Sequence, residues 1–186
     1  MKKVAITLVC YALLTTRAFA GISDPGFYVG GGIGLTKSKI THLDSNTNSD
    51  TSDGGEATKV YGGYVFDRIV HIESSYTEYG KSNSMDINSL ALSMNLGYTF
   101  DNGLRPFTTF GLASIDLNES GGQSFTEGSG AGFHYGVGLE YTSTQIEGLG
   151  IRVAYEADAI NVKTSESSDD ETLNASSFYM GASYKF

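Results

Sequence analysis

Apolar and polar residues alternate along most of this chain with a period of two. The last segment shows this most clearly, with one face formed by Phe178, Met180, Ala182, Tyr184 and Phe186. The opposite face is formed by Ser177, Tyr179, Gly181, Ser183 and Lys185. Successive side chains of a strand point to opposite sides, so this period predicts β-structure. No long window of the sequence repeats apolar residues every three to four positions, as a helix would require. The pattern therefore predicts an all-β protein.

The same alternation recurs upstream and predicts eight strands in all. The expected segments are 27–36, 59–66, 70–77, 89–100, 106–117, 134–141, 152–158 and 173–186. The pattern of segment 106–117 is ambiguous, and there we place Phe110 and Leu112 on the apolar face. Strands of about 9–11 residues cross a membrane when they are tilted, and we expect each segment to do so.

The connections between these segments alternate between short and long. Residues 66–68 and 101–103 are tight turns, the second with an Asn-Gly hairpin signal, and 142–150 is somewhat longer. The other connections are 38–55, 80–86, 118–130 and 163–174, and most are acidic and rich in Ser, Thr and Asn. A wall that faces lipid must pair every backbone group, so the sheet has to close. The sequence therefore predicts an eight-stranded antiparallel up-and-down transmembrane β-barrel with both termini on the short-turn side.

Residues 1–20 have the pattern of a secretory signal peptide, and we expect the barrel domain to occupy 21–186. A basic start precedes a short apolar run, and Ala18-Phe19-Ala20 is a small-x-small cleavage site. The single cysteine, Cys10, lies within this segment. The formal net charge is −9, and the loss of three bases with the signal leaves about −12. So acidic a chain argues against nucleic acid as a partner.

Several charged residues face the predicted interior. Glu73, Glu140 and Arg152 do so by periodicity alone, and His71 shares the face of Glu73. Eight strands enclose an interior just wide enough for side chains, so we expect a filled lumen. Buried charges are tolerated when they are paired, which predicts a structural ion-pair network. The alternative is a gate for small ions.

Short motifs in this order resemble the small OmpA-like outer-membrane β-barrel family, which includes the OmpA transmembrane domain, the OmpX/Ail group and the opacity-type proteins. The motifs are Phe27-Tyr28-Val29-Gly30, Gly62-Gly63-Tyr64, Ile72-Glu73-Ser74-Ser75-Tyr76, Asn95-Leu96-Gly97-Tyr98, Gly138-Leu139-Glu140-Tyr141 and Tyr184-Lys185-Phe186. The resemblance covers about residues 27–186. The periplasmic peptidoglycan-binding domain of OmpA is expected to be missing.

The resemblance implies a location in the bacterial outer membrane and insertion by the outer-membrane assembly machinery. That machinery would recognise a final strand that ends in Phe186, with Tyr184 on the same face. The resemblance also implies that Glu73, Glu140 and Arg152 belong to a charged cluster in the lumen.

One position of this implied cluster departs from the family pattern. Asn95 stands where the family has a lysine, and Lys59 is a candidate for the missing base.

Three functions remain open. The first is a non-enzymatic protein with a structural or adhesion-like surface role through its acidic loops, and the second is a narrow, porin-like channel. The third is a lipid A-modifying enzyme, which the absence of a His-x-Ser motif disfavours. Asp44-x-Asn46-x-Asn48-x-Asp50 resembles a calcium loop, but Ser49 stands where that loop needs glycine. We predict no catalytic residue, cofactor or specific metal site.

The expected surroundings of the protein follow from this location. They are outer-membrane lipid and lipopolysaccharide, with possible host surface molecules at the loops. The expected oligomeric state is a monomer.

Overall fold

The computed structural model describes residues 24–41, 51–52, 55–82, 85–119, 129–163 and 170–186. Its strands are β1 (Gly26–Thr41), β2 (Thr51–Ser52), β3 (Glu56–Val65), β4 (Val70–Ser82), β5 (Met85–Gly97), β6 (Leu104–Glu119), β7 (Ser129–Thr142), β8 (Leu149–Lys163) and β9 (Asp170–Lys185). The expected signal peptide and the calcium-like segment 44–50 lie outside the described residues.

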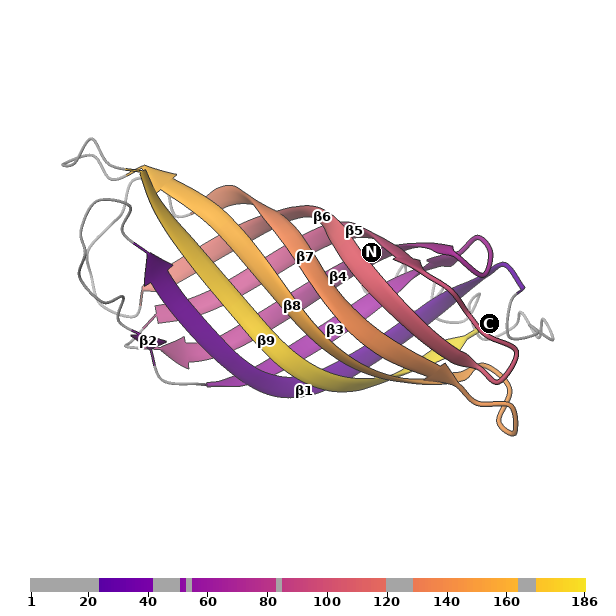
Figure 1. The fold of residues 1–186 in the computed structure, drawn as a ribbon. Helices are drawn as coiled ribbons and strands as arrows, with labels where there is room; N and C mark the ends of the chain where they lie inside the picture. The colour runs from indigo at the N-terminus through magenta and orange to yellow at the C-terminus, as the bar shows by residue number, and fades with distance from the viewer. Residues whose placement is uncertain (1–23, 42–50, 53–54, 83–84, 120–128, 164–169) are drawn as a thin grey trace, which may run out of the picture.

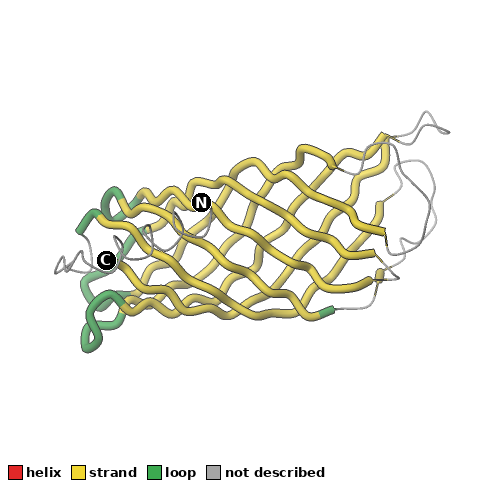
Figure 2. Tube along the Cα trace, turned by 180° about the vertical axis from the view of Figure 1, so that it is seen from behind, coloured by secondary structure: helices red, strands yellow, loops and turns green. Residues whose placement is uncertain are grey.

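Eight long strands form a closed antiparallel barrel (Figure 1). Each long strand pairs with the next, and β9 pairs with β1 to close the sheet. The two-residue β2 adds to the far end of β1. The described turns gather with the C-terminus at one end of the barrel (Figure 2). The predicted eight-stranded up-and-down barrel is therefore confirmed.

No helix among the described residues is long and apolar enough to span a membrane.

The register between strands gives the barrel its stagger. One hydrogen-bonded row of inward positions passes around the wall through Lys185, Tyr28, Gly63, Glu73, Ser93, Gly111, His134, Asp158 and Ala175. The row starts on β9 at Lys185 and returns to β9 at Ala175, ten residues away. Eight strands with such a stagger tilt by about 40° from the barrel axis. Residues on one row therefore lie at different heights, and the row connects the short-turn end with the loop end.

The outer wall carries an apolar belt, as the alternation predicts. Ile33 and Leu112 are 73% and 72% exposed, and Phe110 also faces outward at 40%. From Leu90 on β5 to Phe100, just past the end of that strand, the belt extends about 33 Å along the chain and about 25 Å at the expected tilt. This height matches the apolar band of outer-membrane barrels.

Aromatic side chains form contacts along the short-turn edge of this belt. The ring centroids of Phe27 and Tyr64 lie 4.8 Å apart, and those of Tyr98 and Phe100 lie 5.1 Å apart. Aromatic rings at this level occupy the membrane interface in barrels of this kind.

Several strands extend beyond the belt at the loop end. β1, β6 and β9 have sixteen residues each, against the 9–11 or so that a crossing needs. On the outer face of β3 and β4 the belt gives way to the exposed residues Glu56 and Glu78. The paired strands therefore continue past the apolar belt at this end.

Ala157 is an exception among the outward positions. The alternation predicts that it faces out, as its register partner Tyr135 does at 37% exposure, yet Ala157 is fully buried and its other register partner, Ser176, is only 7% exposed. The Asn174 side-chain amide on β9 donates to the Tyr135 hydroxyl on β7 at 3.0 Å, across β8. We attribute the burial of Ala157 to these larger side chains on both neighbouring strands.

The short turns are fixed by side-chain hydrogen bonds. The backbone N–H groups of Val70 and Ile69 donate to the Asp67 carboxylate, and these bonds hold the pKa of that carboxyl below its usual range. Arg68 Nη1 donates to Asp101 Oδ1 at 2.6 Å, which ties the first turn to the second. Gly103 has a φ of 84°, the left-handed conformation that the Asn-Gly signal predicts.

The belt generates a test of the lipid-facing assignment. Val137 is 59% exposed near the middle of the belt, and Val137→Arg should lower the free energy of unfolding by about 2–4 kcal/mol because it places a charge in the bilayer core. Ile151 lies at the short-turn end of the belt, and Ile151→Arg should lower the free energy of unfolding by only about 0–1 kcal/mol. Urea unfolding in lipid vesicles measures both, and equal costs would contradict the assignment.

Candidate functional site

The charged side chains of the lumen come from facing strands of the barrel. Lys59 on β3, Glu73 on β4, Glu140 on β7, and Arg152 and Glu156 on β8 all point inward and are 8% exposed or less. The pleat of each strand places them inside because their neighbours belong to the outer belt. A closed barrel of eight strands brings these groups together at its centre.

Arg152 is the centre of this cluster. Its Nη1 donates to Glu73 Oε2 at 2.6 Å. Its Nε and Nη2 both donate to Glu140 Oε2, at 2.9 and 2.7 Å. The guanidinium therefore links β8 to β7, its neighbour, and to β4 across the lumen. Charge-assisted bonds of this length are the strong ones, and a fully buried arginine needs them.

Glu73 receives several donors besides Arg152. The Tyr28 hydroxyl donates to its Oε2 at 2.8 Å, and the Asn95 side-chain amide does so at 3.3 Å. Lys59 Nζ lies 3.7 Å from Glu73 Oε1. Asn95, which replaces the lysine expected from the family pattern, thus contacts the glutamate as a neutral donor. Lys59 supplies a base to the same carboxylate.

A second set of contacts extends the network toward the loop end. Lys59 forms an ion pair with Glu156, whose other oxygen accepts from the Tyr179 hydroxyl at 2.8 Å. His134 Nδ1 lies 2.7 Å from Asp158 Oδ1. The Tyr79 hydroxyl donates to Asp158 Oδ2 at 2.5 Å. Buried charges thus continue along much of the lumen.

Aromatic rings enclose the bases of the cluster. The Arg152 guanidinium lies 4.5 Å from the ring centroid of Tyr61 and 5.0 Å from that of Phe107. Lys59 Nζ lies 4.9 Å from the ring of Tyr179. Together with Tyr28, these rings belong to one buried cluster at mid-barrel. Cation–π contacts hold the bases in place where water is excluded.

Three other residues singled out from the sequence lie apart from the ion pairs. His71 is inside the barrel and 4% exposed, but neither of its ring nitrogens has a hydrogen-bond partner in the part of the chain that the structure describes. Tyr184 and Phe186 lie outside the lumen, with ring centroids 5.4 Å apart. The Phe186 backbone N–H donates to the Phe27 carbonyl at 2.9 Å, next to the seam between β9 and β1. The role of this end as an assembly signal stays a prediction.

Arg105 is the main residue that the sequence reasoning missed. It lies on β6, is 1% exposed, and is in register with Glu140. The expected strand began one residue later, at 106, which left Arg105 outside both the strand and the expected turn 101–103. Its position two residues before Phe107 and four before Thr109, both buried, is the alternation that could have identified it. The alternation places Tyr28 and Tyr179 on the inward face, but it does not show that they donate to carboxylates.

The arrangement is suited to hold charge in place more than to perform chemistry. Each of its carboxylates is engaged by a base, a histidine or a hydroxyl group. In the part of the chain that the structure describes, no three His, Cys, Asp or Glu side chains are placed to hold a metal ion.

The network predicts a large effect of Arg152. Arg152→Met should lower the free energy of unfolding by about 3–5 kcal/mol because it removes the ion pair of the buried Glu140 and leaves Glu73 with only the longer contact to Lys59. Adding Glu73→Gln and Glu140→Gln to Arg152→Met should restore part of the loss, since the two carboxylates that had bound Arg152 are then neutral. Arg68→Ala, in an exposed turn, is the control and should change little. Denaturant unfolding measures the stability of Arg152→Met, of the triple variant and of the control. A triple variant that is less stable than Arg152→Met would contradict the interpretation.

Solved structures of other proteins share this barrel. Neisserial surface protein A is 16% identical, with a TM-score of 0.61 over 87% of this chain and 97% of its own. The N-terminal barrel domain of Pseudomonas aeruginosa OprF is 17% identical, with a TM-score of 0.51 over 83% and 97%. The outer membrane protein OprG from Pseudomonas aeruginosa is 14% identical, with a TM-score of 0.50 over 87% and 96%. At these identities the likeness shows the fold.

A search of curated proteins finds no match. A family model, in contrast, shows the family to which the chain belongs. The model of the outer membrane protein β-barrel domain matches residues 6–186, which is nearly the whole sequence. The chain therefore belongs to the outer membrane protein β-barrel family and is a protein of the bacterial outer membrane.

Proposed function

We propose that this protein is a non-enzymatic barrel with a closed lumen, which serves the envelope by structure and by contact through its surface loops. The observation that carries the proposal is the engagement of Arg152 by Glu73 and Glu140 within a collar of aromatic rings. A lumen filled in this way leaves the outer wall and the loops as the parts that meet other molecules.

The filled lumen disfavours the narrow channel. A passage would require Arg152 to leave both carboxylates, and breaking a buried pair costs several kcal/mol. The rings of Tyr61 and Phe107 would also have to move away from the guanidinium. We therefore propose that the ion pairs act as a structural plug.

The position of the histidines disfavours the enzyme. Acyl hydrolysis of a lipid needs a base and a nucleophile at the surface that the lipid contacts. His71 and His134 are both buried in the lumen, at 4% and 2% exposure. Among the described residues, neither histidine reaches the outer wall.

The length of the strands supports a role at the surface. The paired strands continue past the apolar belt, and the described strand ends that flank the connections 38–55, 118–130 and 163–174 lie at that one end. Loops carried by a rigid scaffold are common sites of binding. One structural relative is named a surface protein, which agrees with this role.

The proposed partners follow from this role. Outer-membrane lipid and lipopolysaccharide would surround the belt, the assembly machinery would insert the barrel, and host surface molecules would meet the loops. We propose that the barrel is a monomer, because its strands are all paired within one chain.

Conductance of a planar bilayer tests the closed lumen. The protein should show no stable channels, whereas Arg152→Ala should conduct, because it removes the side chain that links Glu73 to Glu140. Arg68→Ala, at an exposed turn, is the matched control and should stay closed. Stable channels of the unaltered protein would support the porin-like alternative.

Exchange of loops tests the surface role. Replacing 118–130 with a short Gly-Ser linker should leave a barrel that still migrates as a compact species in an unheated gel. Bacterial cells that carry this variant should adhere less to host surfaces than cells that carry the unaltered protein. Replacement within 143–148, on the short-turn side, is the control and should leave adhesion unchanged. Equal adhesion of both variants and the unaltered protein would contradict surface contact through that loop.

A further inference from the structure

The loop half of the lumen holds an apolar cluster beside its buried polar groups. The cluster is formed by Tyr79, Ile87, Ala91, Ala113, Ile115 and Ala175. Each of them is 5% exposed or less. A packed apolar cluster of this kind has no polar partners to offer to water, and it stays dry.

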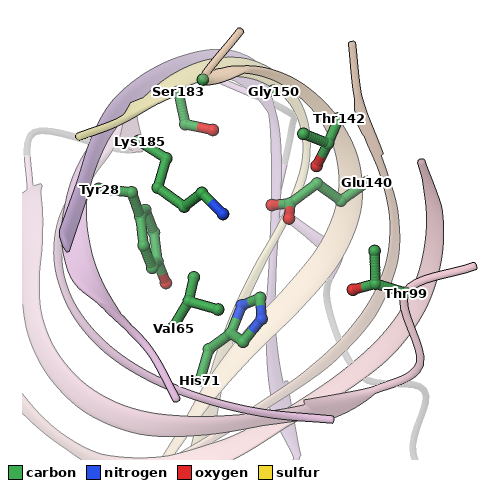
Figure 3. Close-up of a pocket in the computed structure, with 10 residues that line it drawn as sticks. Tyr28, Val65, His71, Thr99, Glu140, Thr142, Gly150, Ser183 and Lys185 are labelled. Carbon is green, nitrogen blue, oxygen red and sulfur yellow. The ribbon is translucent and has the colours of Figure 1, made fainter. Parts of the chain in front are cut away.

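The short-turn end contains a polar cavity instead (Figure 3). Its volume is about 30 Å³, and its lining includes Tyr28, His71, Thr99, Glu140, Ser183 and Lys185. One bound water occupies roughly 10–15 Å³ on this measure, so the cavity can hold about two. Water is retained where a site offers two to four polar partners, and this lining offers more.

Several buried polar atoms, on His71 in the cavity wall and on residues of the next strands, have no hydrogen-bond partner among the described residues. Both ring nitrogens of His71 are unpaired, as are Nε and Nη1 of Arg105 and the side-chain oxygens Oδ1 of Asn95 and Oγ1 of Thr109. His71, Asn95 and Thr109 lie on one row across β4, β5 and β6. Arg105 Nη2 donates to the Asn95 carbonyl at 3.3 Å, which places the guanidinium on the same patch.

Leaving these groups unpaired would be costly. A buried polar atom without a partner costs about 1–3 kcal/mol, and more when it is charged. A patch of neighbouring unpaired atoms beside a cavity of the right size therefore indicates bound water.

Glu140 connects the patch to the cavity. Both bonds from Arg152 go to Oε2 of Glu140, and Arg105 is in register with Glu140 on the other side. Figure 3 shows the Glu140 carboxylate pointing into the cavity, with His71 and the Lys185 side chain around the same space. The cavity thus reaches the ion network from the short-turn side.

We propose that the short-turn half of the lumen is a hydrated binding site, open at the short-turn end and blind at Arg152. Bound water bridges His71, Arg105 and Glu140 there, and the site admits other neutral or monocationic species of similar size. The apolar cluster around Ala113 stays dry. The blind end rests on the closed lumen proposed above, whereas the hydration of the short-turn half does not.

Single cysteines test this inference, because the only cysteine of the chain is Cys10, in the expected signal peptide. Thr99 in the cavity and Ala113 in the apolar cluster are equally buried, at 4% exposure each. In the folded barrel, Thr99→Cys should react with Ag⁺, a small thiol-reactive cation, roughly 100-fold faster or more than Ala113→Cys, which should react only when the barrel opens. Thr109→Cys should react at an intermediate rate or faster, since it lies on the hydrated patch.

Equal rates for Thr99→Cys and Ala113→Cys would overturn the inference, as would faster reaction of Ala113→Cys. If Thr99→Cys does not fold, as judged by migration of the unheated protein, Ser183→Cys in the same cavity replaces it. Slow reaction at the cavity combined with an absence of channels would refute the hydrated site and leave the closed lumen standing. Fast reaction at both positions combined with stable channels would refute the closed lumen.

Discussion

Backbone pairing within the lipid is the constraint on which the rest of this structure depends. Every N–H and C=O in the hydrocarbon must find a partner in the protein, and a sheet achieves this only by closing on itself. Here the closure occurs between β1 and β9, and the register gives a stagger of ten residues over eight strands. Strand number and stagger together fix the width of the barrel, and hence the space left for side chains.

That narrow space determines how the interior can be filled. Among the described residues, the buried bases are Lys59, Arg105, Arg152 and Lys185, and the buried acids are Glu73, Glu140, Glu156 and Asp158. The two sets are equal in number, so the lumen is balanced when both histidines are neutral. They are not evenly placed, because Glu156 and Asp158 follow Arg152 toward the loop end, whereas Arg105 and Lys185 lie at the short-turn end.

The same constraint explains what the sequence could and could not predict. Alternation identified the strands and the inward face of Glu73, Glu140 and Arg152, because the pleat forces each side chain to one side or the other. It could not show which inward residues meet across the lumen, since that depends on register and stagger. The contact of Arg152 with Glu73, from strands that are not neighbours, is the clearest case.

Other parts of the site lacked any signal of their own. Arg105 was not predicted because the start of its strand was ambiguous in the sequence. The hydrogen bond from the Tyr28 hydroxyl to Glu73 was not predicted because the alternation treats tyrosine as an apolar residue. The loops that would carry the proposed surface role vary freely in such folds, and neither pattern nor fold identifies their partner.

The most direct test of the account is the energetic coupling between Glu73 and Arg152, because these residues join opposite walls of the barrel. A double-mutant cycle with Glu73→Gln and Arg152→Met, measured by unfolding in lipid vesicles, isolates that term. The account predicts a coupling of about 1–3 kcal/mol, with the double variant more stable than the sum of the single losses would allow. Additivity within about 0.5 kcal/mol would contradict the claim that a central ion-pair network holds the lumen closed.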